Sequence, residues 1–212
     1  VIHNENILEK YIKKITADID IDFPFKVSID CGNGVTGAIA KKIFSAFNIN
    51  THIINESVDG NFPNHPPDTS NEKNLVQLKN EIKSNKSSIG FAYDGDGDRI
   101  IVLKSNGDII WPDQLMILFS RSILKNNKDA KIVYDIKCTK YLEEEIIKNN
   151  GIPVLSRTGH SFIKKAMIQE KALLGGEMSG HIFFADKWKG FDDGIYASIR
   201  LLEILSNNEN YE

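Results

Sequence analysis

The stretch Tyr93-Asp94-Gly95-Asp96-Gly97-Asp98-Arg99 alternates three carboxylates with glycines, between the apolar runs Ile89–Tyr93 and Ile100–Leu103. The pattern predicts a charged loop at the end of a strand. Like charges this close repel one another, so the loop requires solvent or a cation to neutralise it. Because glycine has no Cβ, the backbone can turn all three carboxylates toward one point. Three such oxygens leave an octahedral Mg²⁺ with open positions for water or a substrate phosphate, so we predict a catalytic Mg²⁺ site at Asp94, Asp96 and Asp98.

Three other interpretations of this loop stay open at this point. An EF-hand also begins with alternating acids, but Arg99 and Ser105 stand where it has glycine and glutamate, and its flanks are helices. A phosphatase of the haloacid dehalogenase type also has a strand followed by D-x-D, with Asp94 as the nucleophile, although Asp98 stands where Thr or Val is usual. The third is a solvated acidic turn without an ion, which the strict alternation disfavours.

Composition narrows the class of protein. The 212 residues carry a net charge of −3 and are 41% hydrophobic and 26% charged, which suits one or two ordinary domains. Lys and Arg are scattered, so we expect no nucleic-acid partner. There is no long apolar run and no signal-peptide pattern, so we expect no membrane partner and a cytoplasmic location. Cys31 and Cys138 are far apart and indicate neither a disulfide framework nor a zinc site.

Apolar periodicity predicts an α/β chain whose second half repeats its first. Lys131–Asp135 resembles Lys26–Asp30, and each is followed by a turn, a helix and a second strand. We predict two similar domains, residues 1–105 and 106–212, each a mixed, mostly parallel β-sheet flanked by helices. The other expected elements are helices over 5–18, about 35–47, about 72–84 and from Pro112, strands at 25–29, 50–55, 108–111 and 152–155, and a hairpin turn at 105–107.

Polar loops of the second half supply further candidate residues, at the strand ends where ligands of α/β sheets gather. Glu177, Ser179 and His181 lie within five residues in a glycine-containing loop, which suits them to hold vicinal sugar hydroxyls. A glycine-rich turn with a chance histidine is the alternative. Lys137 and His160 add a cation and a switchable group, or are solvated structural residues.

Five motifs together carry a family resemblance: D-G-D-G-D-R at 94–99, G-E-M-S-G-H at 176–181, S-I-D-C-G-N-G at 28–34, G-N-F-P-N-H-P-P-D at 60–68 and R-T-G-H-S-F-I-K at 157–164. The chain resembles the α-D-phosphohexomutases, closest to the phosphomannomutase/phosphoglucomutase branch, over nearly its whole length and in the family's order.

The resemblance implies an activity and residue roles. The enzymes interconvert hexose 1-phosphate and 6-phosphate through a phosphoserine and a bisphosphate intermediate. Asp94, Asp96 and Asp98 would hold Mg²⁺, and Arg99 would face the phosphate. Glu177 and Ser179 would recognise the sugar's O3 and O4 hydroxyls. His181, Lys137 and His160 would line the hexose phosphate pocket, and His181 and Lys137 are both plausible as the general base.

The resemblance also has a limit. The family has four domains, and neither the T-A-S-H-N-P-like phosphoserine loop of the first nor the phosphate-clamping loop of the last occurs here. We therefore expect the middle two domains of a longer, monomeric enzyme, able to bind but not to turn over. A naturally short module that binds Mg²⁺ or sugar phosphate is the alternative.

Overall fold

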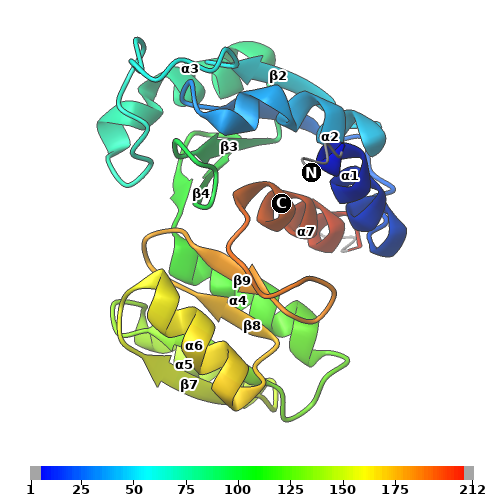
Figure 1. The fold of residues 1–212 in the computed structure, drawn as a ribbon, viewed down its shortest axis with the longest axis vertical. Helices are drawn as coiled ribbons and strands as arrows, with labels where there is room; N and C mark the ends of the chain where they lie inside the picture. Colours follow the sequence, from blue (N-terminus) through cyan, green and yellow to red (C-terminus); the bar gives the residue numbers. More distant parts are fainter. Residues whose placement is uncertain (1–5, 208–212) are drawn as a thin grey trace, which may run out of the picture.

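The computed structural model describes residues 6–207 and consists of two α/β units stacked end to end (Figure 1). The first unit contains two 3₁₀ turns, η1 Val35–Ala38 and η2 Glu72–Leu75, and α1 Ile7–Asp18, β1 Lys26–Asp30, α2 Ala40–Ala46, β2 Asn50–Ile54, α3 Val76–Asn85, β3 Ile89–Tyr93, β4 Ile100–Lys104 and β5 Ile109–Ile110. The second contains α4 Pro112–Leu124, β6 Lys131–Asp135, α5 Lys140–Lys148, β7 Ile152–Ser156, α6 His160–Glu170, β8 Leu174–Gly176, β9 Ile182–Phe184 and α7 Gly194–Ser206.

The first sheet has the strand order β2-β1-β3-β4-β5. β1 pairs in parallel with β2 and β3, and β4 and β5 add antiparallel pairs. Alternate residues of β4 face opposite sides: Val102 packs toward α1, α2 and α7, while Leu103 packs under α3. This period of two buries both faces, as the apolar runs of the sequence require.

The second sheet repeats the same plan in the order β7-β6-β8-β9. β6 pairs in parallel with β7 and β8, and β9 runs antiparallel to β8. Helices α4 and α5 pack on one face and α6 on the other. The predicted fold class, two similar domains with mixed, mostly parallel sheets flanked by helices, is therefore confirmed.

Several predicted elements differ in extent. The expected helix over 35–47 is broken into the turn Val35–Ala38 and α2, and a Cβ at Gly37 would lie 1.8 Å from the carbonyl oxygen of Glu56. The helix over 72–84 likewise begins as the 3₁₀ turn Glu72–Leu75, whose N-cap is Asn71. The strand expected at 108–111 is only Ile109–Ile110. Residue 5 of the first predicted helix lies outside the described residues.

Helix α7 lies between the two units (Figure 1). It packs on β4 of the first sheet as well as on α4 and β9 of the second. The hydroxyls of Tyr93 and Ser198 are 2.6 Å apart across this contact, and both side chains are buried. The hydrophobic core therefore runs continuously from one unit into the other.

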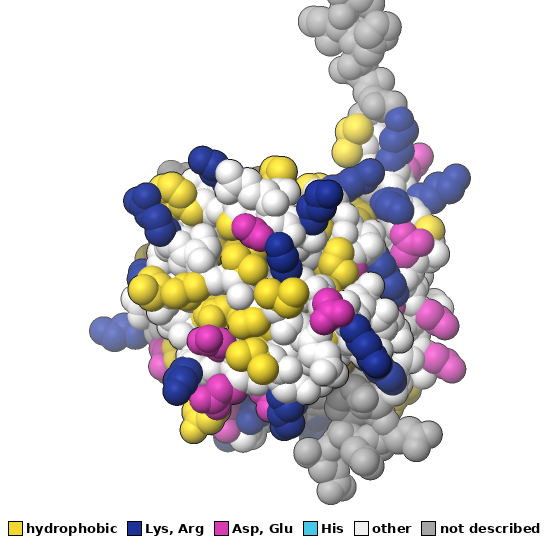
Figure 2. Space-filling model, turned by 90° about the horizontal axis from the view of Figure 1, so that it is seen from below, with side chains coloured by type: hydrophobic (Ala, Val, Ile, Leu, Met, Phe, Trp, Pro, Cys, Tyr) yellow, Lys and Arg dark blue, Asp and Glu magenta, His cyan; other side chains and the backbone are white. Residues whose placement is uncertain are grey.

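The outer surface of the second unit is mixed in character. In Figure 2, seen from the side of α5, α6 and β7, hydrophobic side chains gather among Lys, Arg, Asp and Glu. Exposed apolar residues on these elements are Tyr141, Ile147, Ile152, Leu155, Phe162 and Ile168. Within residues 6–207, none of the helices has the length and apolar character needed to cross a membrane.

Candidate functional site

The aspartate loop connects β3 to β4, and its three carboxylates converge. One oxygen from each of Asp94, Asp96 and Asp98 lies within 4.8 Å of the others. Asp94 is buried, and its Oδ1 accepts hydrogen bonds from the backbone N–H groups of Gly97 and Arg99 at 3.1 and 3.2 Å. Asp96 is exposed. The loop thus presents a cluster of carboxylate oxygens, and its own backbone N–H groups hold the Asp94 carboxylate in place.

Close backbone packing fixes the loop in place. Gly97 has φ +78°, and a Cβ there would lie 2.3 Å from Thr36 Cγ2. The N–H of Val35 donates to the carbonyl of Gly95 at 3.0 Å, and a Cβ at Gly34 would lie 2.5 Å from the same oxygen. Glycines at these positions allow the turn after β1 to support the loop.

The negative charge of the loop is only partly balanced by neighbouring side chains. Burial raises the pKa of Asp94 to about 6, and the neighbouring carboxylates of Asp98 and Asp96 add to the rise. Arg99 opposes it only partly, because its Nε is 3.4 Å from Asp94 Oδ2 and its side chain is 38% exposed. A divalent cation would supply the missing positive charge.

The aspartate loop of the first unit joins the G-E-M-S-G-H loop of the second through the backbone. Arg99 and His181 form an isolated antiparallel bridge, and the N–H of Ile100 donates to the carbonyl of Gly180 at 3.1 Å. Gly180 has φ +103°, and a Cβ would lie 2.9 Å from the carbonyl oxygen of Ile100. Only glycine fits this crossing without strain.

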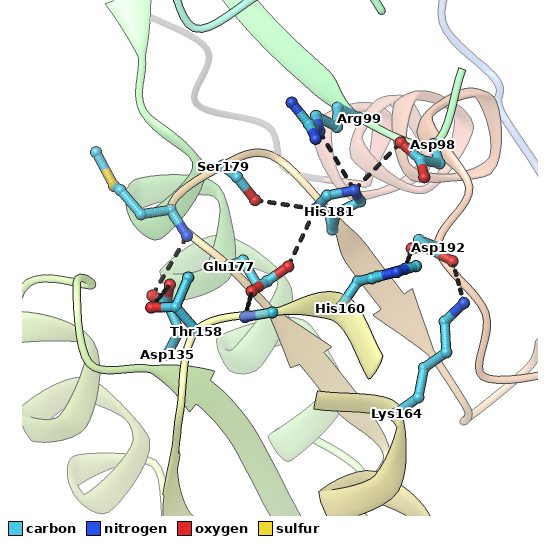
Figure 3. Close-up of polar contacts among 12 residues, drawn as sticks. Asp98, Arg99, Asp135, Thr158, His160, Lys164, Glu177, Ser179, His181 and Asp192 are labelled. Carbon is cyan, nitrogen blue, oxygen red and sulfur yellow. Dashed lines mark hydrogen bonds and ion pairs between the residues drawn. The ribbon is translucent and has the colours of Figure 1, made fainter. Parts of the chain in front are cut away.

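His181 stands at the centre of the combined site (Figure 3). Its Nδ1 lies 3.0 Å from Glu177 Oε2 and 2.9 Å from Ser179 Oγ, and its Nε2 lies 3.2 Å from Asp98 Oδ1. Burial alone would lower the pKa of His181, but the hydrogen bond to Glu177 and the charge of Asp98 raise it above its ordinary value. Glu177 is buried, and its pKa is lowered, against the effect of burial, by His181 and by the N–H of Gly159, which donates to Oε1.

His160 and Asp192 extend the site on the other side of His181. The rings of His160 and His181 stack with centroids 5.5 Å apart. His160 Nδ1 is 3.2 Å from Asp192 Oδ2, and Lys164 Nζ is 2.7 Å from Asp192 Oδ1. Burial would raise the pKa of Asp192, but Lys164 and His160 together hold it below its usual range.

The remaining predicted residue, Lys137, is set apart from these contacts. It is exposed in the turn after β6, and no hydrogen bond or ion pair within residues 6–207 involves it. The predicted residues Asp94, Asp96, Asp98, Arg99, Glu177, Ser179, His160 and His181 are brought together. Their roles toward metal and sugar remain predictions.

Sequence reasoning missed several residues of the site. Asp135, at the end of β6, accepts from Thr158 Oγ1 at 3.0 Å and from the N–H of Met178 at 3.4 Å, so it connects two of the loops. Asp192 was also missed. The local sequence contained a signal only for its neighbour Asp193, because an aspartate directly before the apolar run of α7 is a common N-cap. Asp193 is that cap and accepts from the N–H of Tyr196 at 2.8 Å.

The structure excludes one of the alternatives for the aspartate loop. Antiparallel strands flank it on both sides, which excludes an EF-hand.

Comparison with known proteins gives the family. The family model described as phosphoglucomutase/phosphomannomutase, alpha/beta/alpha domain II matches residues 9–107, and that of domain III matches residues 111–211. The chain is 47% identical over 208 residues to a phosphomannomutase/phosphoglucomutase of Pseudomonas aeruginosa and 44% identical over 209 residues to a phosphoglucomutase of Neisseria meningitidis. These matches cover 98% and 99% of the chain but 45% of each relative.

A solved structure agrees with the sequence relatives. The crystal structure of a phosphoglucomutase/phosphomannomutase family protein from Burkholderia thailandensis superposes with a TM-score of 0.95 at 41% identity, over 98% of this chain and 45% of that one. The chain thus spans about half the length of these proteins. It belongs to the phosphoglucomutase/phosphomannomutase family and contains the family's domains II and III.

Proposed function

We propose that this chain is the metal-binding and sugar-binding part of an enzyme that interconverts hexose 1-phosphate and hexose 6-phosphate through a phosphoserine and a bisphosphate intermediate. The observation that carries the proposal is the backbone bridge between Arg99 and His181. It joins a cluster of three carboxylates to a loop of sugar-binding residue types, so a phosphate held at the first would place its sugar beside the second.

The aspartate loop fits Mg²⁺ on its own chemistry. Its donors are all carboxylate oxygens, which is the ligand set that Mg²⁺ prefers. Burial is the main cause of the raised pKa of Asp94, and the neighbouring carboxylates of Asp98 and Asp96 add to it, so a cation at this loop would favour the ionised form of Asp94. Asp94, Asp96 and Asp98 would hold the ion, and when bound it would neutralise charge on the phosphoryl oxygens.

The other residues would bind and orient the sugar phosphate. Arg99 is partly exposed next to the aspartates and supplies a fixed positive charge for the phosphate. Ser179 can both donate and accept hydrogen bonds, and each Glu177 oxygen keeps a lone pair beyond its present contact. These groups suit adjacent sugar hydroxyls.

Phosphoryl transfer needs a group to take the proton of the attacking hydroxyl. In each half-reaction a hydroxyl oxygen forms the new P–O bond, the old P–O bond breaks, and the proton leaves the attacking oxygen. The His181 ring lies between Asp98 of the aspartate loop and Glu177 and Ser179 of its own loop, so we propose it as the residue that takes and returns this proton. Lys137 is exposed and without a partner in the described part of the chain, and we propose that it binds substrate from the rim.

The test uses a chimera, because the phosphoserine motif is not among these residues. Residues 1–212 would replace the matching 45% of the Pseudomonas aeruginosa relative. We expect the chimera to convert mannose and glucose 1-phosphates to 6-phosphates, and D96A in it to abolish the Mg²⁺-dependent rate. D59A, which changes an aspartate of another loop, is the matched control and should keep it. Wild-type turnover by the D96A chimera would refute the role of the loop.

The same preparations distinguish the alternatives. The isolated 212-residue chain should bind Mn²⁺ but release no phosphate from sugar phosphates. Phosphate release by it with Mg²⁺ would favour a phosphatase. Binding by the chain combined with an inactive chimera would favour a module that only binds.

A further inference from the structure

A second cluster of metal-ligand residue types lies beside the aspartate loop. One ligand atom from each of Asp98, His160, His181 and Asp192 lies within 4.8 Å of all the others. We propose that these four residues form a second metal site, selective for Zn²⁺ and separate from the Mg²⁺ site except for the shared carboxylate of Asp98. The residues come from the β3–β4 loop, the start of α6, the β8–β9 loop and the segment before α7, so no short sequence motif contains them.

The ligand set favours Zn²⁺ over Mg²⁺. Two imidazoles and two carboxylates match the four-coordinate N and O sites typical of zinc, whereas Mg²⁺ is bound by oxygen. Zinc bonds of about 2.0–2.2 Å require the four atoms to move closer together than they stand. His160 can make this movement because its side chain is 53% exposed at the first turn of α6.

The surroundings of His181 orient it as a metal ligand. Glu177 carries an acceptor-only carboxylate 3.0 Å from Nδ1, so in the neutral ring the proton is on Nδ1. The lone pair is then on Nε2, the nitrogen that faces Asp98 at 3.2 Å. In zinc sites, a histidine that binds the metal through one ring nitrogen usually donates the N–H of its other ring nitrogen to a carboxylate or carbonyl group.

Two cations border the cluster and must be accommodated. Lys164 occupies Oδ1 of Asp192 at 2.7 Å and leaves Oδ2, which now faces His160, for the metal. Arg99 Nε is 3.3 Å from His181 Nε2 and would have to turn away; its partial exposure allows this. Zinc binding therefore competes with the contact between Arg99 and His181.

This competition has a consequence that rests on the proposed function. Zinc at the second site would occupy the proton-accepting nitrogen of His181 and displace Arg99, so it should inhibit turnover even when Mg²⁺ fills the aspartate loop. Binding itself does not depend on that function, and it can be measured on the isolated chain.

The experiment measures Zn²⁺ binding to the isolated chain by calorimetry with excess Mg²⁺ present, and Co²⁺ binding by visible absorption. We expect one Zn²⁺ site that persists in D96N. H160A should weaken it more than about tenfold, because loss of even an outer partner of a metal-binding histidine costs about 10–100-fold. H52A is the matched control, since His52 is also exposed and paired with a carboxylate, Glu81 Oε2 at 2.9 Å. Co²⁺ should show the intense bands of four-coordination in the wild type and lose them in H160A.

Equal Zn²⁺ affinity in H160A and H52A would overturn the proposal. So would Zn²⁺ binding that disappears in D96N but survives in H160A, because the ion would then lie in the aspartate loop. Weak, six-coordinate Co²⁺ bands in the wild type would do the same. H160Q keeps a polar side chain at this exposed position, and it repeats the measurement should H160A change the melting temperature.

Discussion

Gly180→Ala tests the join between the two loops. Gly180 has φ +103°, where an L-residue is strained, and its new Cβ would lie 2.9 Å from the carbonyl oxygen of Ile100. That oxygen belongs to the backbone of a central strand and cannot move aside as a flexible side chain would. The substitution must therefore either strain the backbone or separate the two loops.

The expected cost follows from these two effects. A side chain in the left-handed region costs about 1–2 kcal/mol. Weakening the hydrogen bond from Ile100 N–H to Gly180 carbonyl adds about 0.5–1.5 kcal/mol. The sum, roughly 1.5–3.5 kcal/mol, corresponds to a fall in Tm of about 3–14 °C, at about 2–4 °C per kcal/mol for a chain of this size.

Thermal and urea unfolding followed by circular dichroism would measure this change. Gly60→Ala is the matched control, because no atom lies within 4 Å of its Cβ position and its φ is not positive. It should change the free energy of unfolding by less than about 1 kcal/mol. If Gly180→Ala melted within a degree of wild type, or no lower than Gly60→Ala, the crossing would not be the constrained point inferred here.

Three further perturbations follow from the same contacts. Asp96→Asn, at an exposed carboxylate, should weaken Mn²⁺ binding by the chain at least tenfold without lowering Tm. Unchanged affinity in calorimetry, or a lower Tm in melting curves, would contradict this. Burial raises the pKa of Asp193 to about 6, so its folded form holds a proton better than its unfolded form. The stabilisation from its protonated form is present below the pKa of the unfolded state and is lost as pH rises to the pKa of the folded state. In urea titrations, the free energy of unfolding of wild type relative to D193N should therefore fall by up to about 3 kcal/mol between pH 4 and pH 7. A difference that stays constant with pH would contradict this. Arg200→Met should lower the free energy of unfolding in urea by about 3–5 kcal/mol, because the buried guanidinium donates two hydrogen bonds of 2.8 and 2.9 Å to Asp186 and methionine donates none. A decrease below about 1 kcal/mol would show that the ion pair has little net value.

The parts of the site that lie in one short segment could be predicted from sequence. Asp94, Asp96 and Asp98 alternate with glycines in a single loop, and the repeated strand pattern places such loops at strand ends. Asp192 could not be predicted in this way, because its partners His160 and Lys164 are 32 and 28 positions earlier in the chain and meet it only through the packing of α6. Tertiary contacts of this kind leave no local period.

The predicted boundaries of the first unit's helices were wrong for a similar reason. The apolar spacing over 35–47 fits one helix, but the chain at Gly37 passes so close to Glu56 that the first turn tightens to 3₁₀. That approach involves a strand end about twenty residues later, which no window of propensity includes. The spacing of apolar residues predicted which side of the helix faces the core, and the distant contact determined the residue at which the helix starts.

The position of α7 has a consequence for how this chain can be divided. The N–H of Gly194 donates to the carbonyl of Gly97 at 3.0 Å, and Ser198 meets Tyr93, so the last helix completes the wall of the first sheet. Cutting at residue 105 would therefore strip an apolar face from the amino-terminal piece. We expect each piece alone to melt at a lower temperature than the intact chain does. A gene fusion that exchanges the first unit should therefore exchange α7 together with it and with the second unit, as one block.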